Sequence, residues 1–248
     1  MSEEVILLEV SESRRPERVP SHLSRLRKRL SGGRRAQREE FNSILEIAGI
    51  LAKQDPKALP LLVRLIGRSV QARVMTHVLR QPDSSGFSCE NDSMMFSSLI
   101  ELTRDGRRLD ELKREVHSPR KLDLGVDLVL PWPWNGGRVV NCLSGLRPGG
   151  DWGRWRQDPN HCIELWLPLG IGWVHGGNHS LTVGILEAKG KVKPEVTYDI
   201  SAIYKHVTCD GLEYKRKHDG SVIGRVPDLE MAAVFEIGRL IHKHRVTF

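Results

Sequence analysis

The chain has 248 residues, and its 38 lysines and arginines exceed its 31 aspartates and glutamates, which gives a formal net charge of +7. This excess suits a polyanionic partner such as a nucleotide or a nucleic acid. The sequence has no run of 18 apolar residues and no positively charged leader, so we expect neither a membrane partner nor export. Four widely spaced cysteines without a CxxC pair argue against a disulfide framework or a zinc ribbon, and we expect a cytoplasmic protein with reduced thiols.

A basic cluster marks the N-terminal segment, which Pro16, Pro20 and the Gly32-Gly33 pair interrupt. The members of this cluster are Arg25, Arg27, Lys28, Arg29, Arg34 and Arg35. A dense run of like charge tends to stay mobile until a polyanion neutralises it. The sequence therefore predicts an irregular, mobile arm over residues 1–35. This arm either binds nucleic acid or is a solvated basic tail or short surface helix.

Helical periodicity follows over residues 36–117. Apolar residues recur every three to four positions over 41–51, and Asp55-Pro56 ends this helix and starts the next, which continues to Val78. After a loop near 81–86, the pattern predicts a third helix from Asp92 or Ser93 to about residue 114. We expect a helical hairpin or a small bundle.

Residues 118–248 are richer in glycine, tryptophan and β-branched residues. The patterns predict strands at 124–130, within 161–174 and at 192–200, and a hairpin of 212–217 with 222–226 through Asp219-Gly220. They predict helices at 135–146, capped by Asn135, at 180–189, and from Asp228 onward. The predicted fold class is α+β, with an N-terminal helical region, a small mixed-sheet domain and a C-terminal helix.

The segment with the clearest chemical potential lies between a predicted strand and a predicted helix. It contains Gly176, Gly177, Asn178, His179 and Ser180. Glycines at such a junction allow a positive φ or a close approach to a ligand, and Asn178 or Ser180 can cap the helix. A helix N-terminus offers free amides to an anion. The segment predicts a phosphate site with His179 at its mouth, or alternatively a tight structural turn.

The run Gly177-Asn178-His179-Ser180 resembles the Gly-x-His-Arg motif of the ParB/sulfiredoxin-like superfamily, with similar predicted elements over residues 120–205. This resemblance implies nucleotide phosphates at the motif, with ATP or CTP and Mg²⁺ as the expected ligands. Some members of that superfamily are described as nucleases. The segment from residue 199 to the C-terminus resembles an uncharacterised bacterial family that often occurs near mobile elements.

The sequence departs from this motif at one position, because the arginine that contacts phosphate is replaced by Ser180. The replacement removes a charge-assisted contact, which is stronger than a neutral hydrogen bond. Either Arg138, Arg147 or Arg154 substitutes for it, or nucleotide binding is lost. Sulfiredoxin chemistry is not expected, because the motif cysteine of that enzyme is Asn178 here.

Other polar residues precede the strand that follows residue 160. Asp158 and His161 are candidates to orient a water molecule or a metal ion, while Asp158 also fits an Asx turn that opens the strand. A three-histidine metal site of His161, His175 and His179 is disfavoured because two glycines separate the last two, and no metal site is predicted.

Two tryptophans lie beside arginines in the same region. Trp152 and Trp155 neighbour Arg154 and Arg156, an arrangement that suits either base stacking or packing at the rim of the core.

The leading expectation is a prokaryotic protein linked to nucleotides or nucleic acids, with His179, His161 and Asp158 as candidate catalytic residues. Whether it is an enzyme, such as a phosphotransferase, a nucleotide hydrolase or a nuclease, stays open. One alternative is a non-catalytic nucleic-acid-binding module that uses the basic arm. Another is an interaction or regulatory protein that binds a partner through a helical face within residues 41–112. The sequence does not set the oligomeric state.

Overall fold

The computed structural model describes residues 22–81 and 94–247, and for residues 22–31 it describes the backbone alone. The described residues fall into two units, which divide between Arg35 and Ala36. Helix α1 (His22–Gln54) makes residues 22–35 helical, which corrects the irregular arm predicted there. Leu23, Leu26 and Leu30 recur at helical spacing among arginines and lysines, which are good helix formers. Residues 1–21 of the predicted arm lie outside the described part.

Two consecutive helices joined by a short turn open the second unit. Helix α1 ends at Gln54, a short 3₁₀ helix η1 (Pro56–Ala58) makes the turn, and helix α2 (Leu59–Arg80) follows. The Asp55 side chain accepts a hydrogen bond from the Lys57 amide, which starts the turn. The prediction that Asp55-Pro56 separates two helices is confirmed.

The predicted third helix is wrong over most of its described part. Met94 is helical, but residues 95–108 form turns and irregular backbone, and helix resumes only for the short α4 (Leu109–Leu112). Gly106 takes a φ of +82°, and the Thr103 hydroxyl accepts a hydrogen bond from the Arg107 amide over 2.8 Å, which closes a loop instead of a helical turn. Phe96 and Leu102 enter the core from this loop, so their spacing reflects a loop that folds over the core.

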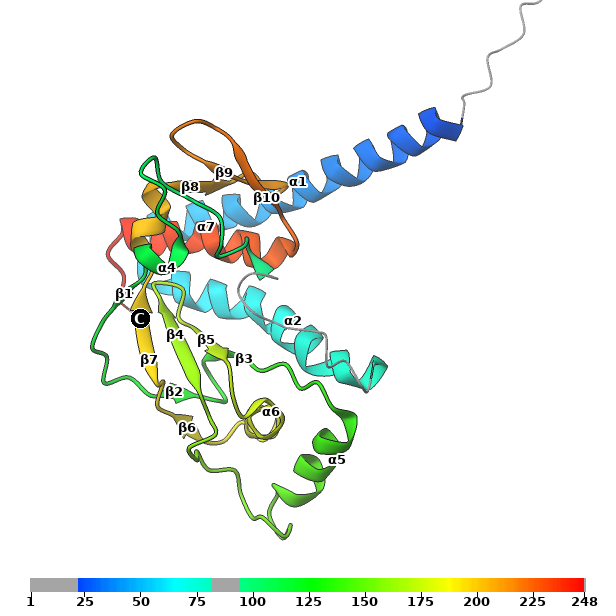
Figure 1. The fold of residues 1–248 in the computed structure, drawn as a ribbon, viewed down its shortest axis with the longest axis vertical. Helices are drawn as coiled ribbons and strands as arrows, with labels where there is room; N and C mark the ends of the chain where they lie inside the picture. Colours follow the sequence, from blue (N-terminus) through cyan, green and yellow to red (C-terminus); the bar gives the residue numbers. More distant parts are fainter. Residues whose placement is uncertain (1–21, 82–93, 248) are drawn as a thin grey trace, which may run out of the picture. The chain divides into compact units, whose positions relative to one another are not determined.

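A mixed sheet forms the centre of the second unit (Figure 1). Its strands in the described part, in spatial order, are β1 (Arg114–Glu115), β7 (Val196–Asp199), β4 (Ile163–Leu167), β5 (Ile171–Val174) and β3 (Leu128–Leu130). Strands β3 and β5 are parallel, as are β4 and β7, whereas β4 and β5 form an antiparallel pair. Helix α5 (Gly136–Gly145) follows β3, and helix α6 (Asn178–Leu186) follows β5.

The two faces of this sheet belong to two apolar clusters, because successive residues of a strand point to opposite faces. Leu128 and Leu130 join the cluster under α2 and the C-terminal helix α7 (Leu229–Lys243), whereas Val129 joins the cluster under α6. The first cluster contains residues from α1, α2 and the sheet. The described residues from Ala36 onward therefore share one core.

The remaining elements complete the α+β fold. They are β2 (Leu122–Asp123) paired with β6 (Lys191–Val192), η2 (Ser201–Lys205), and the sheet of β8 (Val207–Cys209), β9 (Glu213–Arg216) and β10 (Val222–Arg225). The predicted strand over 124–130 shortens to β3, and the one over 192–200 splits into β6 and β7. The predicted hairpin, the Asp228 cap of α7 and the α+β class are confirmed. In the described residues, no helix has the length and apolar character that crossing a membrane requires.

Candidate functional site

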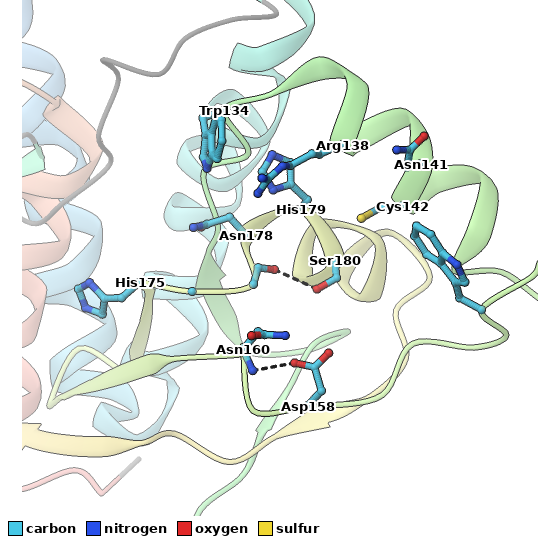
Figure 2. Close-up of a pocket in the computed structure, with 13 residues that line it drawn as sticks. Trp134, Arg138, Asn141, Cys142, Asp158, Asn160, His175, Asn178, His179 and Ser180 are labelled. Atoms are coloured by element: carbon cyan, nitrogen blue, oxygen red, sulfur yellow. Dashed lines mark hydrogen bonds between the residues drawn. The ribbon is translucent and has the colours of Figure 1, made fainter.

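The candidate site lies where two neighbouring strands end. The parallel strands β3 and β5 lead into α5 and α6, so both helices begin at the same edge of the sheet. A pocket of about 550 Å³ opens there, lined by residues from the starts of both helices (Figure 2). A crevice at the carboxyl ends of parallel strands is a frequent ligand site in α/β sheets.

The turn between β5 and α6 depends on its two glycines. Gly177 has a φ of +78° and is the N-cap of α6, and a Cβ at Gly176 would lie 2.5 Å from the Asn160 carbonyl oxygen. No side chain caps α6, which corrects the prediction that Asn178 or Ser180 does so. The first amides of a helix have no intrahelical acceptor, so those of α6 are available to an anion.

Asn178 and His179 connect the starts of the two helices. The Asn178 side-chain oxygen accepts a hydrogen bond from the Trp132 amide over 2.9 Å. Nε2 of His179 accepts one from the Asn135 amide over 3.2 Å. Burial, and then the charge of Arg138, lower the pKa of His179 below 6.5, so the ring is neutral at pH 7. With Nε2 as an acceptor, the neutral ring carries its proton on Nδ1 and can donate it to a ligand.

Arg138 supplies the positive charge of the pocket wall on α5. Its guanidinium carbon lies 4.9 Å from the centroid of the Trp134 ring, and both residues line the pocket. Of the three arginines predicted as substitutes for the motif arginine, Arg138 is the one in this pocket. Arg154 lines an adjoining hollow, and Arg147 lies outside both and donates to the Ser144 carbonyl.

Sequence reasoning missed that α5 contributes one whole face to the site. Asn141 and Cys142 line the pocket together with Arg138. Their spacing of three and four residues places all three on one side of a helix. This signal was readable once the parallel pairing of β3 with β5 was known, because that pairing brings α5 beside α6.

Asp158, His161 and Ser180 form a hydrogen-bonded chain beside the pocket. The Asp158 amide donates to Nδ1 of His161 over 2.8 Å, and Nε2 of His161 lies 2.6 Å from the Ser180 hydroxyl oxygen. Because Nδ1 accepts a hydrogen bond, the neutral ring carries its proton on Nε2 and donates it to the Ser180 oxygen. The Ser180 hydroxyl in turn donates to the Gly177 carbonyl over 3.1 Å. In this state the buried His161 holds the turn in place and does not accept the Ser180 proton.

The Asp158 carboxylate has two roles in the structure. One oxygen accepts a hydrogen bond from the Asn160 amide over 2.8 Å, which is the predicted Asx turn (Figure 2). The side chain is also exposed and lines the pocket, so a water molecule or a cation can reach it.

The three histidines near the site do not converge on one point. His175 faces Glu164, with 3.6 Å between Nε2 and the carboxylate, while His161 contacts Ser180 and His179 contacts Asn135. Among residues 22–81 and 94–247, no three His, Cys, Asp or Glu side chains lie close enough to hold a metal ion.

The basic cluster of the N-terminal segment lies apart from this pocket in the sequence and belongs to the other unit. Arg25, Arg27, Lys28 and Arg29 fall on the helical backbone of α1, and their side chains are outside the description. Arg34 and Arg35 are exposed on the same helix.

Comparison with known proteins places the chain in a family. A family model described as "Family of unknown function (DUF6710)" matches residues 26–248. No curated protein and no solved structure matches the chain. Since the family model spans most of the sequence, including α5, α6 and the pocket between them, the chain belongs to the DUF6710 family.

Proposed function

We propose that this protein binds a nucleotide, with its phosphates at the first turn of α6. The observation that carries the proposal is the uncapped start of α6, which opens into a pocket lined by Arg138. Helix N-termini with free amides bind phosphate through hydrogen bonds and the helix dipole. The resemblance of Gly177-Asn178-His179 to the ParB/sulfiredoxin-like motif supports the same ligand.

Each side chain of the pocket then has a defined role. Arg138 takes the place of the motif arginine and pairs with a phosphate oxygen, and Nδ1 of His179 donates a second hydrogen bond. Trp134 offers an aromatic surface to the base. A Mg²⁺ ion that arrives with ATP or CTP would meet Asp158, since Mg²⁺ in nucleotide sites is held by one or two carboxylates and the phosphates.

The arrangement favours holding a phosphate over moving a proton. Both nitrogens of His161 are engaged in hydrogen bonds, and Nε2 of His179 is occupied by the Asn135 amide. Any phosphoryl transfer or nuclease reaction would therefore depend on positioning and on charge stabilisation by Arg138 and the α6 amides. We place this binding activity in a prokaryotic cytoplasm.

A thermal-shift panel tests the proposal. ATP, CTP and GTP are each added with and without Mg²⁺ to the wild type, to Arg138→Ala and to Arg147→Ala, which serves as a matched control outside the pocket. A ligand at a hundredfold its Kd adds about 2.7 kcal/mol, or roughly 5–11 °C for a chain of this size. The proposal requires a shift that Arg138→Ala reduces and Arg147→Ala preserves. The absence of a shift with any nucleotide would refute it.

A second candidate function uses the basic cluster of the N-terminal segment to bind nucleic acid. Its support is that α1 carries four basic residues between His22 and Leu30 and two more at Arg34 and Arg35. Binding through about six phosphates would lose roughly a thousandfold in affinity between 50 and 200 mM salt. Deletion of residues 1–35 would abolish this binding, whereas Arg138→Ala would not.

A further inference from the structure

A second hollow adjoins the nucleotide pocket. Its volume is about 740 Å³, and it shares Cys142, Trp152, Asp158 and Ser180 with the pocket of about 550 Å³. Pockets of roughly 300–1,000 Å³ each suit one small ligand. A mononucleotide in the first pocket therefore leaves the second hollow available for a further part of the same ligand.

The wall of the second hollow has the chemistry of an anion site. Arg154 and Arg156 line it and are exposed, and neither forms an ion pair with the residues that the structure describes. Trp155 also lines it, is 7% exposed, and its Nε1–H has no hydrogen-bond partner in the described part of the chain. Two exposed cations without an ion-pair partner in the described residues indicate a ligand that brings negative charge.

The segment that carries these residues is anchored at both ends. The Trp152 amide donates to the Gly145 carbonyl over 3.1 Å at the end of α5. Gln157 exchanges two hydrogen bonds with the Lys193 backbone, of 2.8 and 2.9 Å. The arginines therefore project from a fixed segment, which lowers the entropic cost of binding.

Trp152 lies at the boundary between the two hollows. Its ring packs against α5 at Gly145, where a Cβ would lie 2.5 Å from the indole, yet the residue is 57% exposed. An indole held on one side and exposed on the other is a platform for a stacked base, and such stacking tolerates any base.

We infer that the two hollows form one groove for single-stranded nucleic acid of at least two nucleotides. This inference rests on the proposed function, because the first nucleotide occupies the pocket at α6. The next base stacks on Trp152, and the next phosphate lies against Arg154 and Arg156. A basic groove with exposed aromatic side chains is the arrangement that single-strand-binding proteins use.

One acidic side chain opposes this ligand. Asp158 is the only carboxylate among the described residues that line the two hollows, and it lies in the part they share. A phosphate that passes it is repelled unless a cation intervenes. Asp158→Asn should therefore raise the affinity for an oligonucleotide in the absence of Mg²⁺.

The test compares ligand lengths on the full chain by isothermal titration. Each of the four homopolymeric deoxytetranucleotides is compared with its mononucleotide, and NAD is included as a dinucleotide with a 5′–5′ linkage. The variants are the double substitution Arg154→Ala/Arg156→Ala, Trp152→Ala, and Arg147→Ala as a matched control on the neighbouring segment.

The groove predicts that a tetranucleotide binds at least tenfold more tightly than its mononucleotide. The double variant should lose most of this gain and keep mononucleotide affinity within about twofold. Trp152→Ala should also lose most of the gain, while Arg147→Ala changes neither the gain nor mononucleotide affinity. Mononucleotide binding with no gain for the tetranucleotide, or tighter binding of NAD than of any tetranucleotide, overturns the inference and leaves the proposed function standing. No binding of any mononucleotide refutes the proposed function itself.

Discussion

The two faces of the central sheet are covered in different ways. Helices α2 and α7 bury one face in the larger apolar cluster, where Phe235 and Ile237 have no exposed surface. The other face is covered by α6 and by the irregular segment of residues 147–160, over a smaller cluster. The candidate site and the second hollow both lie on this second side. The contrast shows that one face supplies stability while the other leaves polar groups accessible to a ligand.

The hydrogen bonds of the two faces also have different roles. On the α2 side, the Gln71 amide donates to the Val129 carbonyl over 2.5 Å, and Arg68 donates to the carbonyls of Gly125 and Val126 over 3.0 Å each. These bonds fasten α2 to β3 and to the residues that precede it. On the α6 side, Asn178 and His161 instead hold a turn that ends in free amides.

The largest expected effect is on the α7 side. Phe235→Ala removes a ring that contacts Phe96, Tyr204 and Tyr214 and should lower the free energy of unfolding by about 3–5 kcal/mol, as measured by urea denaturation. Leu181→Ala in the smaller cluster should cost less, about 2 kcal/mol, because the adjacent loop can close over the cavity. An equal or larger loss in Leu181→Ala would remove the contrast between the faces.

The next effect concerns the turn at the site. Gly177→Ala places a side chain at a φ of +78° and sets its Cβ 2.5 Å from Cδ2 of His161, so it should cost about 2–4 kcal/mol and abolish nucleotide binding. Gly149→Ala is the control, because its φ is +76° and its Cβ would meet nothing within 4 Å. Its cost should be about 1 kcal/mol. Equal losses in the two variants would show that contact with His161 is unimportant.

A smaller effect is expected from an ion pair at the edge of the larger cluster. Burial acts to raise the pKa of Asp210, but hydrogen bonds from Lys215 and from the Leu212 and Glu213 amides outweigh it and lower the pKa to about 2. Because the unfolded state binds this proton more tightly, the contribution is present above about pH 4 and is lost as the pH falls through about 2.

Asp210→Asn should therefore cost about 1 kcal/mol at pH 7, and this cost should shrink as the pH falls from about 4 through about 2. Its thermal denaturation across this range, set against the wild type, gives the measurement. A difference that stays constant with pH would show that the carboxylate charge contributes nothing.

The smallest effect is expected from His179. Its lowered pKa means that the unfolded state takes up the proton first as the pH falls below 6.5, so stability declines from there until the folded-state pKa is passed. His179→Gln removes this pH-dependent contribution to stability. The stability curves of the wild type and the variant should therefore diverge only below about pH 6.5. Parallel curves from pH 5 to 8 would show that burial of the ring does not lower the pKa of His179.

The sequence predicted the elements whose signals are local. The Asp55-Pro56 break, the Asn135 and Asp228 caps and the Asp219-Gly220 hairpin are all present, because a side chain or turn residue specifies each within four positions. The third helix failed for the opposite reason. The apolar residues of the 94–108 segment are placed by contacts with a distant core, so their spacing imitates a helix.

The candidate site was predicted only in part. The Gly176-Gly177 turn and the histidine at the helix start were readable, because glycine pairs at a strand-to-helix junction are informative on their own. The contribution of α5 was not, since it follows from the pairing of β3 with β5 across more than forty residues of sequence. The contact of His161 with Ser180 likewise depends on the fold, which brings the two residues together from different segments of the chain.

The core shared by the described residues from Ala36 onward has a consequence for how the chain unfolds. The larger cluster collects side chains from Phe41 on α1 to Ile241 on α7, so neither the helices nor the sheet can lose the other and keep their apolar surface covered. Segments that depend on one another in this way melt together. This part of the molecule should show a single cooperative transition, and limited proteolysis should not release a sheet fragment that refolds alone.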